Sequence, residues 1–195
     1  FIADGIKLLM KEDLVPDAAD RRVFRIAPMV ALMGTFAVFV IIPFSPSLIA
    51  RDLALGIFYA LAIGSLSTLA TLMAGWSSGN KYSLIGGLRA AGQLIAYELP
   101  LVLAVVGVVI QAGTMSMQGI VQAQIDQSWP FVLTQFVGFA IFMIAGLAEL
   151  SRIPFDMPIA ESELVMGYVT EYSGFRFLFF FLGEYANMFS LSAIA

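Results

Sequence analysis

Five apolar stretches, separated by short polar segments, dominate the 195-residue chain. Each is close to the roughly 20 residues that a helix needs to cross the hydrocarbon core of a bilayer. We therefore predict an all-α fold, a polytopic transmembrane helical bundle that forms one integral-membrane domain over residues 1–195. The five predicted spans lie within 26–50 (ending near Pro43 or Pro46), 53–75, 90–112, 131–148 and 177–195.

Basic residues fall almost entirely on one side of these spans. Residues 1–25 hold five of the ten Lys and Arg residues, 76–89 and 149–176 hold two each, and the other two connections hold only Arg51. Cytoplasmic loops of membrane proteins carry the excess of Lys and Arg. We therefore expect residues 1–25, 76–89 and 149–176 to be cytoplasmic, with the last span running outward.

Both ends of the chain lie inside patterns that we expect to continue. The first residue is Phe1 rather than Met, and the last apolar stretch is still running at Ala195. We expect a longer protein with spans on either side. Within residues 1–25, the first apolar positions have partial helical spacing, which predicts an amphipathic helix at the cytoplasmic interface. The alternative is the polar end of a preceding span.

The composition narrows the possible functions. Hydrophobic residues make up 60% of the chain and charged residues 12%, whereas about 25% of an average soluble domain is charged, so an ordinary soluble enzyme is excluded. The chain has no Cys and no His, so we expect no iron–sulfur cluster, no ordinary haem and no metal site. The formal net charge of −4 argues against a nucleic-acid partner.

Two carboxylates interrupt the predicted spans, Glu98 in the third and Glu184 in the fifth. A charge at such depth costs about 2.5–3.5 kcal/mol on insertion scales and normally faces protein or water. Pro100 removes a nearby backbone hydrogen bond and predicts a kink, and Asn187 shares the helix face of Glu184 at i+3. We interpret both glutamates as proton-relay groups; the alternative is a structural, paired carboxylate.

The segment 149–176 concentrates acidic residues among apolar ones. Pro154 and Pro158 interrupt any long helix there, whereas residues 160–166 can form a short one. The interleaved apolar residues predict that the segment folds back against protein, and a functional acidic funnel and a subunit-docking loop are both open interpretations. Its charged residues are Glu149, Arg152, Asp156, Glu161, Glu163, Glu171 and Arg176.

Several long motifs point to one known family. They are GWSSGNKY at 75–82, GLRAAGQ at 87–93, YE at 97–98, AE at 148–149, RIPFDMP at 152–158, AESEL at 160–164, GY at 167–168, TEYSG at 170–174, EYAN at 184–187, and KED at 11–13 with Pro16. Together they cover essentially the whole chain and closely resemble the family of respiratory complex I subunit 1, known in the bacterial enzyme as the membrane-embedded H subunit.

The resemblance implies an eight-span family, of which these five spans would be about the second to the sixth. It also implies a quinone-channel and energy-coupling subunit of a proton-translocating NADH:quinone oxidoreductase, which helps couple quinone reduction to proton translocation. Carried over to matching positions, the proton-relay residues would be Glu98, Glu149, Glu161, Glu163, Glu171 and Glu184. The quinone-channel residues would be Lys81, Tyr82, Arg89, Arg152, Phe155 and Asp156.

The same resemblance implies cofactors, partners and a location. Quinone, either ubiquinone or menaquinone, would be the substrate, and FMN and the iron–sulfur clusters would belong to partner subunits, with no redox centre in this chain. The partners would be the hydrophilic quinone-site and terminal-cluster subunits, small membrane subunits and the lipid bilayer. The location would be the bacterial inner membrane.

One departure from the family pattern concerns the acidic segment. The family often has Glu immediately before the AESEL run, whereas this chain has Ile159. Leu150 and Ser151 also replace the commoner Thr-Asn pair. The chain therefore lacks one carboxylate that is often assigned to the quinone region.

Two other function classes compete with this interpretation. The first is a homologous membrane-anchor subunit of a proton-pumping hydrogenase or of an F420- or ferredoxin-dependent oxidoreductase; residues 154–156 and 170–174 favour complex I over it. The second is an independent secondary transporter, which often shows inverted repeats with broken helices. The two halves of this sequence show no such repeat.

Overall fold

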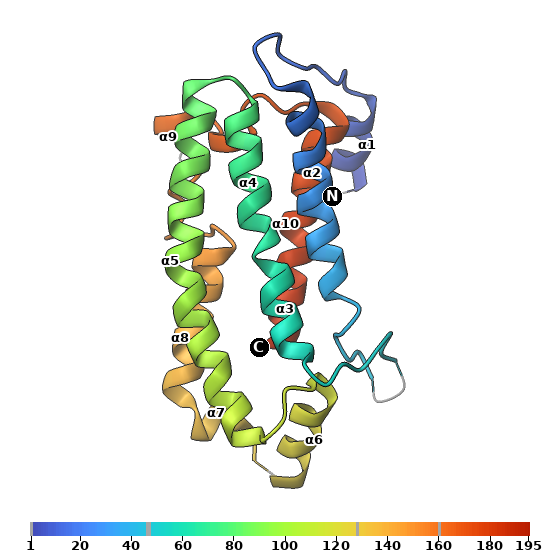
Figure 1. The fold of residues 1–195 in the computed structure, drawn as a ribbon, viewed down its shortest axis with the longest axis vertical. Coiled ribbons are helices and arrows are strands. Elements are labelled where there is room, and N and C mark those ends of the chain that lie inside the picture. Colours follow the sequence, from blue (N-terminus) through green and yellow to red (C-terminus); the bar gives the residue numbers. More distant parts are fainter. Residues whose placement is uncertain (1, 46–47, 128, 160) are drawn as a thin grey trace.

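A computed structural model describes every residue except 1, 46–47, 128 and 160, and it leaves out the side chains of residues 2, 161 and 162. Over the described residues the chain forms an elongated bundle of helices (Figure 1), and its only other regular structure is a single bridge between Ser45 and Leu48. The elements are α1 (Ile2–Met10), α2 (Arg21–Val38), α3 (Gly56–Gly64), α4 (Leu66–Ser77), α5 (Lys81–Ala112), α6 (Met117–Gln127), α7 (Phe131–Thr134), α8 (Phe136–Glu149), α9 (Glu161–Leu164), the 3₁₀ turn η1 (Gly167–Val169) and α10 (Gly174–Ile194).

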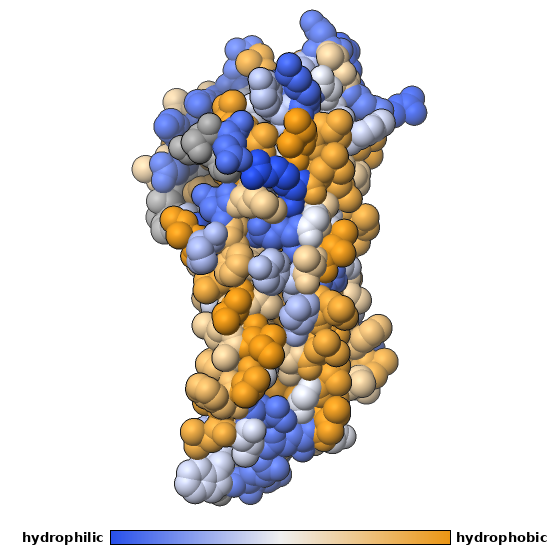
Figure 2. All heavy atoms as spheres, turned by 90° about the vertical axis from the view of Figure 1, so that its left-hand side faces the viewer, coloured by the Kyte–Doolittle hydropathy of each residue, from blue (hydrophilic) through white to orange (hydrophobic). Residues whose placement is uncertain are grey.

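Each of the five predicted spans contains helix, although in the first span α2 ends at Val38, before the end predicted near Pro43 or Pro46. By length and apolarity, three stretches of the described chain can cross a membrane on their own: Gly56–Ser77 (α3 with α4), α5 and α10. Helix α2 and the α7–α8 pair occupy the first and fourth predicted spans. Figure 2 shows apolar side chains along much of the bundle between polar ends, as expected for a surface that faces lipid. The all-α, polytopic membrane bundle is confirmed.

The connection expected over residues 76–89 is much shorter than that range. Helix α4 ends at Ser77 and α5 begins at Lys81, where the Asn80 side chain caps α5 by accepting a hydrogen bond from the Tyr82 amide at 2.9 Å. Helix α5 has 32 residues, which gives a length of about 48 Å at 1.5 Å per residue. A hydrocarbon core is about 30 Å thick, so the first turns of α5 extend beyond it as helix rather than as loop.

Two features of the bundle were not predicted. Helix α6 lies between the third and fourth spans, where glutamines interrupt any apolar run. Helix α8 has only 14 residues and ends partway along α5 (Figure 1), so residues 150–159 continue without helix beside α5. The short helix expected within 160–166 is present as α9.

Residues 11–20 tie the start of α2 to the start of α10. The Leu14 amide donates to the Ser173 hydroxyl at 3.0 Å, and Arg176 pairs with Asp13 at 3.1 Å. Segments more than 150 residues apart in the sequence therefore meet at the upper end of the bundle in Figure 1, the end that carries α1, the α4–α5 turn and α9.

A buried aromatic cluster that includes Phe24, Tyr172 and Phe180 lies next to residues 11–20. The rings of Phe24 and Tyr172 stack with centroids 4.1 Å apart, and the Tyr172 hydroxyl donates to the Phe24 carbonyl at 3.3 Å. Burial raises the pKa of Tyr172 to about 12, against the opposing effects of the Ser77 hydrogen bond and Arg176. The hydroxyl therefore stays protonated and remains a donor at any physiological pH.

Glycines allow two of the closest helix contacts. A Cβ atom on Gly86 would lie 2.6 Å from the Cα atom of Gly167 in η1, and one on Gly75 would lie 2.7 Å from the Ser83 carbonyl oxygen. Both obstacles are backbone, which cannot rotate away. Helix α5 therefore packs against η1 and α4 at a distance that only glycine permits.

We predict that Gly86→Ala destabilises the protein by about 1–3 kcal/mol, the usual cost of overpacking. Thermal unfolding of the purified protein in detergent measures the loss. Gly92→Ala is the matched control, because it lies in the same helix and its Cβ would meet nothing within 4 Å. Equal melting temperatures for the two variants would contradict the close contact with η1.

Candidate functional site

An ion pair links the acidic segment to α10. The Arg152 guanidinium lies 2.9 Å from the Glu184 carboxylate, and it also stands over the Tyr185 ring, 5.6 Å from the centroid. The sequence predicts a polar stripe shared by Glu184 and Asn187, and the two residues do line one cavity. The partner from the 150–159 segment was not foreseen, because nothing in the sequence relates residue 152 to residue 184.

Two small cavities follow one another along the bundle. The upper cavity, of about 70 Å³, lies beside this ion pair and is lined by Glu149, Tyr168, Glu184 and Asn187 among others. The central cavity, of about 40 Å³, includes Glu98, Glu149, Asn187 and Ser190 in its lining. Both volumes exceed the roughly 10–15 Å³ that one water needs.

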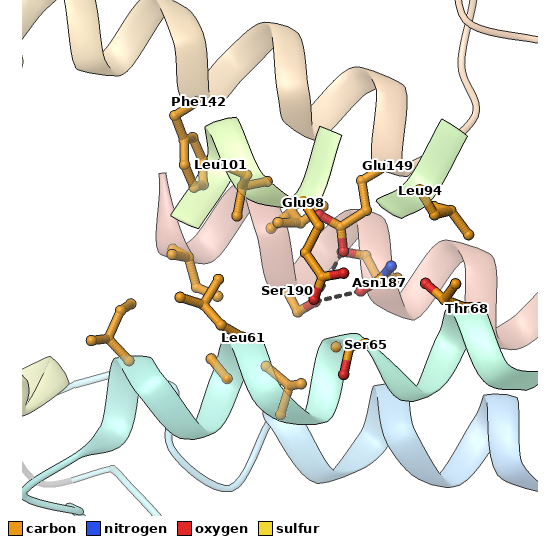
Figure 3. Close-up of a pocket in the computed structure, with 16 residues that line it drawn as sticks. Leu61, Ser65, Thr68, Leu94, Glu98, Leu101, Phe142, Glu149, Asn187 and Ser190 are labelled. Carbon is orange, nitrogen blue, oxygen red and sulfur yellow. Dashed lines mark hydrogen bonds between the residues drawn. The ribbon is translucent and has the colours of Figure 1, made fainter. Parts of the chain in front are cut away.

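The central cavity brings two of the expected relay carboxylates together. Figure 3 shows Glu98 from α5 and Glu149 from the end of α8 entering the same space, opposite Asn187 and Ser190 of α10. The Ser190 hydroxyl donates to the Asn187 carbonyl at 2.9 Å. Glu149 and Asn187 also line the upper cavity, so polar groups are continuous from the Arg152–Glu184 pair to Glu98.

A break in the second span lies beside the central cavity. Helix α3 ends and α4 begins at Ser65, whose hydroxyl donates to the Ala62 carbonyl at 2.8 Å. Gly64, Ser65 and Thr68 all line the cavity (Figure 3). Irregular backbone at membrane depth is tolerated where it is buried in protein or lines a water-filled cavity. The break therefore presents polar groups to the two carboxylates.

Gln93 holds the end of α8 in place. Its side-chain amide is buried and donates to two carbonyl oxygens, those of Ala148 at 2.7 Å and Phe155 at 2.8 Å. The first acceptor precedes Glu149 and the second lies beyond Arg152. Gln93 thus holds both ends of the short stretch that carries Glu149 and Arg152. In the sequence, the one indication of this role was that Gln93 ends the GLRAAGQ motif.

Several expected site residues lie away from these cavities. Glu163 pairs with Arg89 at 2.6 Å, and Glu171 accepts from the Asn80 amide at 2.5 Å. Lys81 and Tyr82 are exposed and contact each other, with the ammonium 5.4 Å from the ring centroid. These residues lie in or around the turn at the upper end of the bundle. The side chain of Glu161, also expected in the site, is outside the described residues.

The remaining expected residues lie along the 150–159 segment. Asp156 is exposed and close enough to interact electrostatically with Glu184, while the Phe155 ring meets Tyr97 edge to face at 5.1 Å. Ile159 lines the upper cavity. Burial raises the pKa of Tyr168 in the same lining, and the charge of Glu184 adds to the effect.

Comparison with known proteins gives a match over the full length. A family model described as "NADH dehydrogenase" matches residues 1–195. The chain is 52% identical over 193 residues to the NADH-quinone oxidoreductase H subunit of Brevibacillus brevis, covering 99% of this chain and 57% of the relative. It is 53% identical over 201 residues to the protein of the same name from Anaeromyxobacter dehalogenans, covering all of this chain and 48% of the relative. The chain therefore spans about half the length of these curated relatives.

We predict that Gln93→Met destabilises the protein and loosens the 148–155 stretch. Methionine nearly preserves the volume but donates no hydrogen bond. The Phe155 carbonyl loses its Gln93 donor, which costs about 1–3 kcal/mol, whereas the Ala148 carbonyl keeps the Ser151 amide as a donor at 3.1 Å. Hydrogen exchange at residues 148–155, together with thermal unfolding, measures both effects. Gln111→Met in the same helix is the control, because within the described residues the Gln111 amide bonds to the side chains of Gln127 and Thr134 and not to the 148–155 stretch. Unchanged hydrogen exchange at residues 148–155 would show that the Gln93 hydrogen bonds do not hold this stretch in place.

Proposed function

The chain belongs to the NADH dehydrogenase family, and from this premise we propose that it lines a quinone channel and couples quinone reduction to proton translocation in an NADH:quinone oxidoreductase. The observation that carries the proposal is the continuous line of polar groups from Arg152 and Glu184 through Glu149 to Glu98. The name shared by the relatives, that of the NADH-quinone oxidoreductase H subunit, supports the same reaction.

The line of polar groups from Arg152 to Glu98 is better suited to moving protons than to stabilising the fold. Glu98 and Glu149 line one small cavity that has room for water, so a proton can pass between the two carboxylates through that space. Neither residue has a basic side chain in the lining of the central cavity, as far as the structure describes it. Ser65, Thr68, Asn187 and Ser190 supply the hydroxyl and amide groups that a few waters need.

The quinone-facing part is proposed for the segment 150–159 and its neighbours. Arg152 stands over the Tyr185 ring, and the exposed Asp156 follows Phe155, whose ring meets that of Tyr97. A quinone head group needs hydrogen-bond donors, and its isoprenoid tail needs apolar and aromatic surface. Lys81, Tyr82 and Arg89, at the upper end of α5, would border the mouth of this channel.

The relay and its surroundings complete the proposal. Glu163 and Glu171 would extend the acidic surface toward the upper end, as would Glu161. The upper end would face the cytoplasm, since nine of the ten basic residues belong to its three segments, 1–25, 76–89 and 149–176. Hydrophilic subunits and small membrane subunits would be the partners. The iron–sulfur clusters and FMN would belong to partner subunits and not to this chain. The alternative, the anchor subunit of a hydrogenase or of an F420- or ferredoxin-dependent oxidoreductase, would share the helices but not the quinone.

Glu98→Gln in the whole complex tests the relay. A positioned proton donor or acceptor contributes roughly 10²–10⁴-fold to a rate, so we expect NADH-driven proton pumping in inverted membranes to fall about tenfold or more. Glutamine keeps the size and polarity of the side chain but cannot exchange a proton. The pumping rate and the quinone reductase rate are measured on the same membranes.

Asp126→Asn is the matched control, because it neutralises an exposed carboxylate at the opposite end of the bundle, on α6. We expect it to leave both rates unchanged. Full pumping in Glu98→Gln membranes would remove Glu98 from the relay.

A further inference from the structure

A third cavity lies below the central one. This lower cavity has a volume of about 350 Å³ and lies between α5, α6 and the α7–α8 pair, toward the end of the bundle where α6 lies. Three residues line both the lower and the central cavities: Ile57, Phe142 and Ile194. The two cavities are therefore separated by side chains of these residues.

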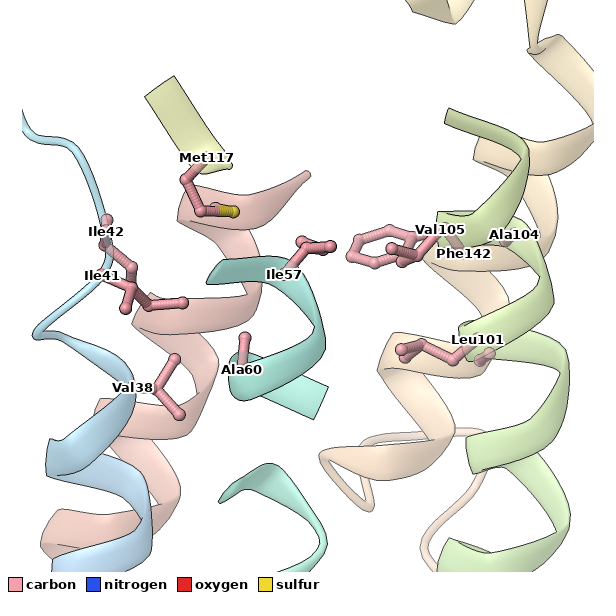
Figure 4. Packing of buried hydrophobic residues seen from close by; sticks show 11 residues of the cluster. Val38, Ile41, Ile42, Ile57, Ala60, Leu101, Ala104, Val105, Met117 and Phe142 are labelled. Carbon is pink, nitrogen blue, oxygen red and sulfur yellow. The ribbon is translucent and has the colours of Figure 1, made fainter. Parts of the chain in front are cut away.

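The dividing wall is wholly apolar. Ile57 is 5% exposed and Phe142 is 8% exposed, and both belong to one buried cluster that also contains Leu101, Ala104 and Val105. In Figure 4 the Ile57 side chain points toward the Phe142 ring, with Leu101 and Val105 beside them. A buried water needs two to four polar partners, and these five residues provide no polar side chain. Constrictions of this kind stay dry.

The cavities on both sides of this wall are lined in part by polar side chains that can bind water. On the central side are Glu98, Glu149 and Ser190. On the lower side, the side chains of Gln124 and Gln135 line a cavity many times larger than one water. Only the apolar wall separates the carboxylates from a space that polar groups can hydrate.

We propose that Ile57 and Phe142 form a hydrophobic seal that stops protons in the central cavity from leaking toward the α6 end of the bundle. The inference rests on the proposed proton route, since a seal matters only if Glu98 and Glu149 exchange protons. A carboxylate relay that opened to both sides of a membrane would dissipate the gradient. The seal confines exchange to the end that carries Arg152 and Glu184.

A passive leak assay tests the seal without catalysis. The purified complex carrying Phe142→Ala is reconstituted into vesicles, a pH gradient is imposed in the presence of valinomycin and potassium, and its decay is followed with an internal pH dye. Removing the ring joins the two cavities, so we expect the gradient to decay several-fold faster than with the unmodified complex. Phe139→Ala is the matched control on α8, since Phe139 lines only the lower cavity.

A second variant covers the case in which Phe142→Ala fails to assemble. Ile57→Thr removes little volume but adds a hydroxyl to the wall, and we expect a smaller, still measurable leak. Adding Glu98→Gln to either leaking variant should slow the leak again, because the protons pass through that carboxylate. Assembled Ile57→Thr complex that leaks no faster than Phe139→Ala complex would overturn the seal.

The two proposals fail separately. The leak assay contains neither NADH nor quinone. Where Glu98→Gln abolishes pumping, so that the relay stands, an unchanged leak in the Phe142→Ala and Ile57→Thr complexes counts against the seal alone. Full pumping by Glu98→Gln complex counts against the relay alone. An ordinary core role for Phe142 and Ile57 would lower the melting temperature of both variants without any change in the leak, and that result would also overturn the seal.

Discussion

An ionised side chain within a bilayer has to be enclosed by protein or water, and the arrangement of this bundle follows from that constraint. Glu98, Glu149, Glu184 and Arg152 come from three helices and one non-helical segment. Each would be costly against lipid. Glu98 and Glu149 line the central cavity, and Glu149 and Glu184 line the upper one. Arg152 pairs with Glu184, and these two side chains remain 38% and 36% exposed. Apolar side chains cover much of the outside of the bundle (Figure 2).

Two interruptions of regular helix make room for this polar interior. The second span breaks at Ser65, and α8 ends at Glu149, partway along its neighbour α5. Such breaks free backbone groups that need new partners. Ser65 bonds its own turn, and Gln93 reaches the carbonyls of Ala148 and Phe155. Gln93 thereby also holds in place the stretch that carries Glu149 and Arg152.

The two halves of the bundle differ in the chemistry of their interiors. Toward the end with α1 and α9, polar cavities and an ion pair lie among the helices. Toward the end with α6, an apolar cluster that includes Ile57, Leu101 and Phe142 separates the central cavity from the larger lower cavity. In the proposed mechanism, this asymmetry would give protons a route into the membrane from one side and a barrier on the other.

Much of this was already determined by the sequence. Long apolar stretches predict spanning helices wherever they occur, because backbone groups in hydrocarbon can be satisfied only within the segment. Within these apolar stretches Glu98 and Glu184 stood out as isolated charges, and the sequence motifs identified the family. Helix α6 escaped notice because its glutamines break the apolar pattern.

Only the tertiary structure decided which charged residues meet. Nothing in the sequence showed which of Arg89, Arg152, Glu163 and Glu171 lie together. In the structure Arg152 pairs with Glu184 beside the upper cavity. At the upper end of the bundle, Arg89 pairs with Glu163 and Glu171 accepts a hydrogen bond from Asn80. The break at Ser65, the grip of Gln93 and the wall between the central and lower cavities were equally invisible in the sequence. The contacts of Gln93 and of the wall join segments tens of residues apart. Apolar periodicity is a property of one helix, whereas enclosure of a charge is a property of several packed together.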